Sequence, residues 1–204
     1  MHADTRQRLL DIAEQLFAER GFYGVSIARI ASEVGFTKQG LLHYFNRKEK
    51  LYGAILQRIS DDFRERQTEA EEAGKEPIES LQRFYRTLAE PTDTNTRRTR
   101  LLMRELLDNN ARSANAENWY LREFLERLIA MVKAVEGLQE LSDEEALVFA
   151  YQLLGAVNYF LISSATLKAI FGDKVMLQMS ENFSADLNLL ITTKVKLALV
   201  RSSS

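Results

Sequence analysis

Residues 27–44, IARIASEVGFTKQGLLHY, place two short helical segments on either side of a glycine. Ser26 and Thr37 are suited to cap the two helices, and Gly35 can adopt the positive φ of the tight turn between them. A steep crossing of two helices requires a small residue at the contact, and Ala31 stands four residues before Gly35. This spacing is typical of a helix-turn-helix.

The second helix of this pair has a polar face that is suited to DNA. Once the apolar residues pack against the first helix, the outer surface is left with Thr37, Lys38, Gln39, Gly40, His43 and Tyr44. A helix in the major groove needs donors and acceptors for base edges near its N-terminus, and its N-terminal amides and lysines attract phosphate. The pattern therefore predicts a recognition helix.

The remaining segments also have helical periodicity, which predicts an all-α fold. Apolar residues recur at helical spacing over residues 4–20, and Asn46 with Glu49 resembles a capping box that opens a long helix. Further helices are expected over residues 77–89, 95–108, 118–136, from Ser142 through the apolar run 146–162, and 181–200, with breaks at Pro91 and 109–115. We divide the chain into a DNA-binding domain, residues 1–50, and a ligand-binding and dimerisation domain, residues 51–204.

Composition excludes several classes of function. With 204 residues, 46% of them apolar, the chain can bury a substantial core, and two prolines and nine glycines favour helices over a sheet. The chain has no cysteine, which excludes disulfides and thiolate chemistry and fits the cytoplasm. It also lacks a Gly-rich phosphate loop, a His-x-x-x-His pair and a nucleophile elbow, so we predict no catalytic residue, no metal site and no cofactor.

The charge distribution permits a DNA-binding end without requiring one. The net charge is −2, but residues 1–66 carry 11 Lys and Arg against 9 Asp and Glu, a net charge of +2, and the remainder carries −4. Cations that displace counterions supply most non-specific DNA affinity. Charge alone therefore does not decide between a DNA-binding protein and another helical protein.

The C-terminal half predicts a dimer and a pocket. The run over residues 146–162 is apolar all round, so it must be covered on more than one side, and the simplest second cover is a partner subunit. We expect the interface to include Leu154, Phe160, Leu187, Leu190 and Ile191. Isolated polar groups among aromatic residues predict a mostly apolar ligand pocket that includes Arg104, Phe124, Gln152 and Asn158.

The same apolar run has to be distinguished from a membrane span. Residues 146–162 are fewer than the ~20 that a bilayer crossing requires, and they include Gln152 and Asn158. We therefore expect a buried helix and no membrane partner.

Three stretches of the first third resemble the TetR repressor family: GFYG at 21–24, SIARIA at 26–31 and TKQGLLHYFNRKEKL at 37–51. The resemblance implies an all-helical fold whose long fourth helix joins a DNA-binding head to a ligand-binding body, with the last two helices forming a dimeric bundle. It implies DNA contacts by Ser26, Thr37, Lys38, Gln39, Gly40, His43 and Tyr44, and a phosphate contact by Lys48. The chain departs from the family pattern at Leu42, where an aromatic residue is frequent, and at Asn46, where proline is frequent.

What the resemblance implies for function is a repressor that binds palindromic double-stranded DNA as a homodimer and is released by a small-molecule effector. Repression, as opposed to activation, comes from the family's usual behaviour. Two other classes stay open at this point. One is a helical small-molecule-binding or scaffolding protein that does not act on DNA, and the other is an all-α enzyme, which the absence of catalytic motifs disfavours.

Overall fold

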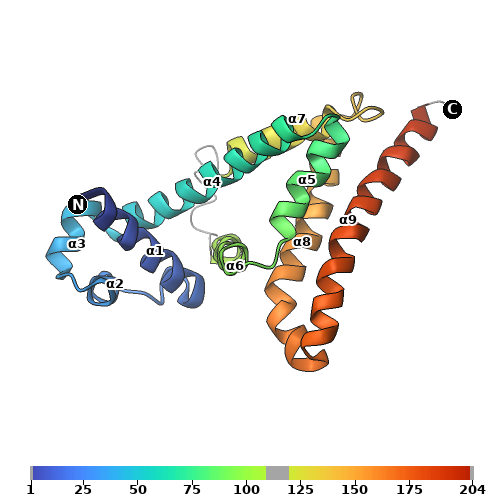
Figure 1. The fold of residues 1–204 in the computed structure, drawn as a ribbon. Helices are drawn as coiled ribbons and strands as arrows, with labels where there is room; N and C mark the ends of the chain where they lie inside the picture. The colour runs from blue at the N-terminus through green and yellow to red at the C-terminus, as the bar shows by residue number, and fades with distance from the viewer. Residues whose placement is uncertain (1, 109–119, 203–204) are drawn as a thin grey trace. The chain divides into compact units, whose positions relative to one another are not determined.

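The structure, a computed structural model, describes residues 2–108 and 120–202. Over these residues it contains nine α-helices and no strand (Figure 1), which confirms the all-α prediction. The helices are α1 His2–Arg20, α2 Ile27–Val34, α3 Lys38–Phe45, α4 Lys48–Ala73, α5 Pro77–Ala89, α6 Asp93–Asp108, α7 Arg122–Lys133, α8 Asp143–Phe171 and α9 Asp173–Ser202.

The chain forms two compact units. The head unit is made of residues 1–61 with 96–122, and the body unit of residues 62–95 with 123–204. Helices α4 and α6 each contribute residues to both units. The expected division into residues 1–50 and 51–204 concerns function and stays a prediction, since the compact units follow a different partition of the chain.

Helix boundaries differ from the sequence prediction at two places. Asn46 does not open the fourth helix: it ends α3 with a φ of 49°, and its backbone N–H donates to the carbonyl of Leu42. The backbone N–H of Arg47 donates to the carbonyl of Phe45, so the chain makes a tight turn at Asn46 before α4 begins at Lys48. Helix α9 begins at Asp173, eight residues before the expected start at Glu181. The expected break at 109–115, and residues 118 and 119, lie outside the described residues.

The head unit is built around apolar residues that the helical spacing brings to one side of each helix. Among its fully or nearly fully buried side chains are Leu9, Ala13, Phe17, Ile30, Ala31, Leu41, Leu51, Ile55 and Ile59. Ala31 has 1% of its surface exposed, as expected for the small residue at the crossing of α2 and α3. This core fixes α2 and α3 relative to α1 and to the first half of α4.

In the body unit, α8 and α9 lie side by side as an antiparallel pair joined at Gly172, and α5 packs against both (Figure 1). Helix α8 spans 29 residues, and an 18-residue window in it has a mean hydropathy of 1.6 with 39% of it buried. Helix α8 is longer than the apolar run over residues 146–162, and by length and composition alone it could cross a bilayer, a test that the core helix of a soluble protein can also pass. Its buried side, from Ala146 to Leu161, packs inside the body unit.

Candidate nucleic-acid interface

The turn between α2 and α3 is defined by two N-caps and one C-cap. The Ser26 hydroxyl accepts a hydrogen bond from the backbone N–H of Arg29 at 3.1 Å, and the Thr37 hydroxyl accepts one from Gly40 at 3.0 Å. Gly35 has a φ of 76°, and its N–H bonds back to the end of α2. The three residues predicted to define the helix-turn-helix therefore do so by satisfying backbone groups that the helix ends leave free.

Helix α3 presents its predicted contact residues as one polar surface. Lys38, Gln39 and His43 are exposed, while Gly40 and Tyr44 are half-buried. The Tyr44 ring meets those of Phe36 and His43 edge to face, with centroid separations of 6.3 and 6.0 Å. Tyr44 is thus fixed by packing, whereas the more exposed side chains can adjust to base edges.

The immediate surroundings of residue 40 explain why a glycine stands there. A Cβ at this position would lie 3.3 Å from both the Phe36 ring and the Thr37 hydroxyl oxygen. Both neighbours hold the start of α3, so a larger residue would press against the N-cap that orients the helix. The sequence indicated Gly40 only as a DNA contact, and it gave no sign of this constraint.

A basic groove borders this surface. It has a volume of about 570 Å³ and is lined by Tyr23, Gly24, Val25, Ser26, Ile27, Ala28, Arg29, Lys38 and Lys48. Three of these residues are cationic and none is acidic. The first residues of α2, α3 and α4 all belong to the lining, so three helix N-termini add their positive ends to the cationic side chains. The groove is therefore suited to a phosphate backbone.

Tyr23 and Arg29 were not among the sequence-predicted contacts, but both line this groove. Tyr23 is 72% exposed, and Arg29 forms an i,i+4 ion pair with Glu33 at 2.6 Å on the outside of α2. Tyr23 and Arg29 each lie three residues from Ser26 in the sequence, and this spacing is what could have indicated that they share a surface with it. Ser26 itself is exposed and bordered by both.

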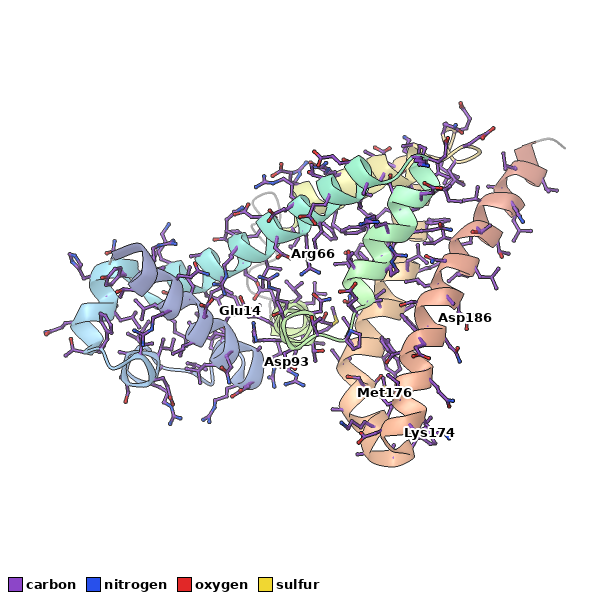
Figure 2. All side chains as sticks on the ribbon, in the orientation of Figure 1. Glu14, Arg66, Asp93, Lys174, Met176 and Asp186 are labelled. Carbon is purple, nitrogen blue, oxygen red and sulfur yellow. The ribbon has the colours of Figure 1, made fainter. Side chains whose placement is uncertain are left out.

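A buried carboxylate joins α6 to the rest of the head unit. Glu14 on α1, labelled in Figure 2, has no exposed surface. Its carboxylate pairs with Arg58, with Arg97 at 3.0 Å and with Arg98 at 3.7 Å. Burial acts to lower the pKa of Arg58, but hydrogen bonds and charge from Glu14 and Asp11 outweigh it and raise that pKa. The sequence analysis found no role for these arginines.

The same helix makes two further polar contacts within the head unit. Arg104, predicted to line the ligand pocket, donates from its guanidinium to the carbonyls of Ala18 and Glu19 at the C-terminal end of α1, at 3.1 and 3.0 Å. A cation there satisfies carbonyls that the helix cannot and matches the negative end of its dipole. The Tyr52 hydroxyl donates to Glu105 at 2.7 Å, and both residues are buried.

The other predicted pocket residues belong to the body unit. The buried Phe124 ring lies between the half-buried Phe63 and the buried Phe84, with centroid separations of 4.9 and 6.1 Å. Gln152 is exposed and accepts a hydrogen bond from Lys194, and Asn158 is half-buried. A shared pocket formed by Arg104, Phe124, Gln152 and Asn158 stays a prediction.

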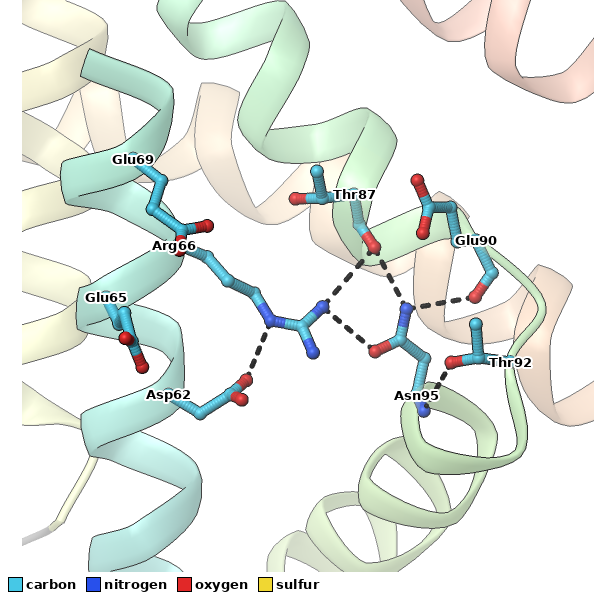
Figure 3. Close-up of a pocket in the computed structure, with 8 residues that line it drawn as sticks. All are labelled: Asp62, Glu65, Arg66, Glu69, Thr87, Glu90, Thr92 and Asn95. Atoms are coloured by element: carbon cyan, nitrogen blue, oxygen red, sulfur yellow. Dashed lines mark hydrogen bonds and ion pairs between the residues drawn. The ribbon is translucent and has the colours of Figure 1, made fainter. Parts of the chain in front are cut away.

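The body unit also contains an open polar pocket of about 390 Å³. It is lined by Asp62, Glu65, Arg66, Glu69, Thr87, Glu90, Thr92 and Asn95 (Figure 3). Arg66 pairs with Asp62 at 2.7 Å and donates to the Asn95 side chain at 3.0 Å. The Asn95 amide donates in turn to the carbonyls of Thr87 and Glu90, both at 2.9 Å, where α5 ends. These polar groups therefore complete the hydrogen bonding of a helix terminus.

Of the predicted interface residues, three are buried in the chain's own core: Phe160, Leu187 and Ile191 are at most 3% exposed. Phe160 stacks on Phe183 at 4.2 Å within the pair of α8 and α9. Leu154 is half-buried and Leu190 is 41% exposed, so these two remain accessible to a partner. Other exposed apolar residues on these helices are Val148, Tyr151, Tyr159, Ile162, Ile170, Phe171, Val175, Leu177, Met179, Leu189, Leu197, Leu199 and Val200.

Together, the α2–α3 turn, the exposed face of α3 and the cation-lined groove define a helix-turn-helix protein. Residues 9–55, which include α2, α3 and parts of α1 and α4, match the model of the bacterial regulatory proteins of the tetR family.

Curated relatives extend the likeness beyond this domain. The transcriptional repressor KstR2 of Rhodococcus jostii is 34% identical over 88 residues, which is 43% of each chain. The regulator RutR of Escherichia coli is 39% identical over 56 residues, 28% of this chain and 26% of that protein. The chain therefore matches less than half the length of these relatives. They are transcriptional regulators, and neither is named as an enzyme.

Solved structures match nearly the whole fold. A transcriptional regulator from Saccharomonospora viridis, solved in complex with choline, has a TM-score of 0.69 at 20% identity over 93% of this chain and 96% of that one. The fatty acid degradation regulator FadR of Bacillus halodurans has a TM-score of 0.70 at 17% identity over 90% and 94% of the two chains. At these identities the likeness shows that the chains share one all-helical fold.

Proposed function

We propose that this protein is a cytoplasmic transcription regulator, a repressor, that binds palindromic double-stranded DNA as a homodimer and releases it when a small-molecule effector binds. The observation that carries the proposal is the groove of about 570 Å³ beside α3, lined by three cations and no carboxylate. It would hold the phosphate backbone while Gln39 and His43 meet base edges.

The homodimer is supported by the apolar residues that α8 and α9 leave exposed. They recur at helical spacing along α8, at Val148, Tyr151, Tyr159 and Ile162. Apart from the helix's own nearby backbone, a Cβ added at Gly155 would meet none of the described residues within 4 Å. A small residue in open space lets a second helix approach closely, and apolar surface of this kind is stabilised when a partner covers it. If a partner subunit covers these apolar residues of α8, no membrane is needed to cover them.

Two copies related by a two-fold axis would place their α3 helices in successive major grooves, ~34 Å apart or somewhat more. An effector in the body unit would release DNA by favouring a conformation in which both heads cannot dock together. The loss of DNA affinity cannot exceed the difference between the effector's binding free energies for the released and the DNA-bound conformations. This coupling free energy is commonly ~1–3 kcal/mol. Helices α4 and α6, which contribute to both units, are the elements that would transmit the change.

Selection of bound duplexes from a random DNA pool, followed by titration of the enriched sequence at two salt concentrations, tests this proposal. Enrichment of an inverted repeat bound by two subunits is the expected result. Absence of enrichment at low salt and without ligand would contradict it and would favour the scaffolding or enzyme alternatives.

Variants separate the roles of single residues within that assay. Lys48→Ala should weaken binding to every sequence and reduce its salt dependence, because it removes a phosphate contact. Gln39→Ala and His43→Ala should change sequence preference with little effect on salt dependence. Unchanged affinity and unchanged preference in both α3 variants would mean that α3 is not the recognition helix.

A further inference from the structure

An aromatic cluster lies directly behind the basic groove of the head unit. The Phe22 ring meets the rings of Tyr23 and Tyr52 edge to face, with centroid separations of 5.3 and 5.0 Å. The Phe17 ring meets that of Tyr52 in the same way, with a centroid separation of 5.1 Å. Phe22, Phe17 and Tyr52 are buried, while Tyr23 is exposed and lines the groove. The cluster therefore extends from the core of the head to the groove wall.

The Phe22 ring also carries a cation. The ammonium nitrogen of Lys48 lies 4.2 Å from its centroid, within the range of a cation–π contact. A free lysine side chain has four rotatable bonds and loses that freedom when it contacts a phosphate. A ring face that already holds the ammonium at the groove would reduce this loss, because the charge is positioned before DNA arrives.

The opposite side of the cluster is fixed by α6. Tyr52 follows Lys48 by one turn of α4, and its hydroxyl donates to the buried Glu105 of α6 at 2.7 Å. A hydrogen bond from a hydroxyl to a buried carboxylate is strong and directional. It therefore fixes the orientation of the Tyr52 ring, and the edge-to-face contact passes that constraint to Phe22.

We propose that Phe22 and Tyr52 are positioning residues for the Lys48–phosphate contact, and that the Tyr52–Glu105 hydrogen bond links α6 to that contact. This inference rests on the proposed DNA-binding function and adds to it a route of control inside the head unit. A displacement of α6 would release Tyr52, loosen Phe22 and leave Lys48 less well placed, without any change in the recognition face of α3.

The test is a double-mutant cycle on the full-length protein with a mixed-sequence DNA duplex about three helical turns long. Affinity is measured over a range of salt concentrations for the unchanged protein, Phe22→Leu, Lys48→Ala and the double variant. We expect Phe22→Leu to weaken binding roughly two- to five-fold and to lower the salt dependence towards that of Lys48→Ala. In the Lys48→Ala background, Phe22→Leu should have almost no further effect.

Conservative variants separate positioning from folding. Phe22→Tyr keeps the aromatic face and should retain the affinity and salt dependence of the unchanged protein. Tyr52→Phe keeps the ring but removes the hydroxyl, and it should weaken duplex binding only when Lys48 is present. Tyr85→Phe is its matched control, because it removes a buried tyrosine hydroxyl bond, to the carbonyl of Ala150, in the body unit.

The outcomes are distinguishable. If the unchanged protein does not bind the duplex at low salt, the proposed function fails and the inference with it. If binding occurs but Phe22→Leu weakens it equally with and without Lys48, Phe22 has only a structural role and the inference alone is overturned. If Tyr52→Phe binds like the unchanged protein, the link to α6 is overturned. Should Phe22→Leu fail to fold, as judged by circular dichroism, Phe22→Met replaces it in the cycle.

Discussion

Glu14 shows how much of the head depends on one side chain. A fully buried carboxylate costs several kcal/mol unless it is paired, and here Arg58, Arg97 and Arg98 surround it. These arginines come from α4 and α6, so the carboxylate holds three helices of the head unit together. Its position within the apolar spacing of α1 gave no indication of this role.

We expect Glu14→Gln to lower the free energy of unfolding by about 3–5 kcal/mol, because it leaves arginine charge without its buried partner. Urea denaturation followed by circular dichroism measures this. Glu33→Gln, which removes the carboxylate of an exposed pair with Arg29, is the matched control and should change the free energy by less than about 1 kcal/mol. Equal losses in the two variants would contradict the role given to Glu14.

Gly35 leads to a second prediction. Its φ of 76° disfavours any side chain, yet a Cβ there would meet none of the described residues within 4 Å other than its own chain neighbours. Gly35→Ala should therefore cost about 1–2 kcal/mol of unfolding free energy through the backbone alone. Chemical denaturation measures this cost, and Ser32→Ala, at an exposed position of α2, is the control that should not reproduce it. If Gly35→Ala leaves the free energy of unfolding unchanged, the turn must relax to a conformation that accepts a side chain.

Among the elements, α8 has the most complete start. The Ser142 hydroxyl accepts a hydrogen bond from the N–H of Glu145, and the Glu145 carboxylate accepts one from the N–H of Ser142. Three acidic residues in the first turn, Asp143, Glu144 and Glu145, also suit the positive end of the helix dipole. The sequence placed the start of this helix at Ser142, and the structure confirms it.

Ser142→Ala should lower the free energy of unfolding by about 1 kcal/mol, since it leaves a backbone N–H of α8 without its acceptor. Denaturant titration with a helical signal measures this, and Ser142→Asp should largely restore the value because aspartate also caps. A loss of equal size in both variants would point to packing around residue 142 and not to the cap.

Glu144 should make this end of α8 sensitive to acid. Hydrogen bonds from its own backbone N–H and from the Ser142 hydroxyl lower the pKa of its carboxyl below the ordinary 4.5. A lowered pKa contributes stability above the ordinary value, and this is lost as pH falls through the folded-state pKa. The melting temperature of Glu144→Gln should thus lie below that of the unchanged protein at neutral pH and equal it in acid. A difference in melting temperature that persists in acid would contradict this expectation. Glu140→Gln, which removes an exposed carboxylate outside α8, is the control.

Most helices could be predicted because the residues that start and end them are close together in the sequence. Contacts between residues far apart in the sequence could not be predicted in this way. Ser26, Gly35 and Thr37 act on backbone groups only a few residues away, so their roles followed from spacing. Arg104 bonds to Ala18, 86 residues earlier, and no periodicity reveals such a partner. For the same reason Phe160 and Leu187 were expected at an interface although α8 and α9 bury them against each other.

For the molecule as a whole, the exposed apolar residues of α8 and α9 lead to a prediction about assembly. Leu190→Arg should convert a dimer into a monomer, because it puts a charge into apolar surface that a partner would cover. Analytical ultracentrifugation measures the change. Leu107→Arg, at a 76% exposed leucine of the head unit, is the matched control. A dimer that persists in Leu190→Arg would move the interface to another surface.

Helices α4 and α6 both pass from one unit into the other, so the head is discontinuous in sequence. A fragment cut after residue 61 would keep Glu14 and Tyr52 but lose Arg97, Arg98 and Glu105. Exchange of heads between related proteins, by recombination or in designed chimeras, therefore has to carry two separate segments of the gene. A single crossover near residue 61 would combine a carboxylate from one parent with arginines from the other, and it succeeds only where both parents share that pairing.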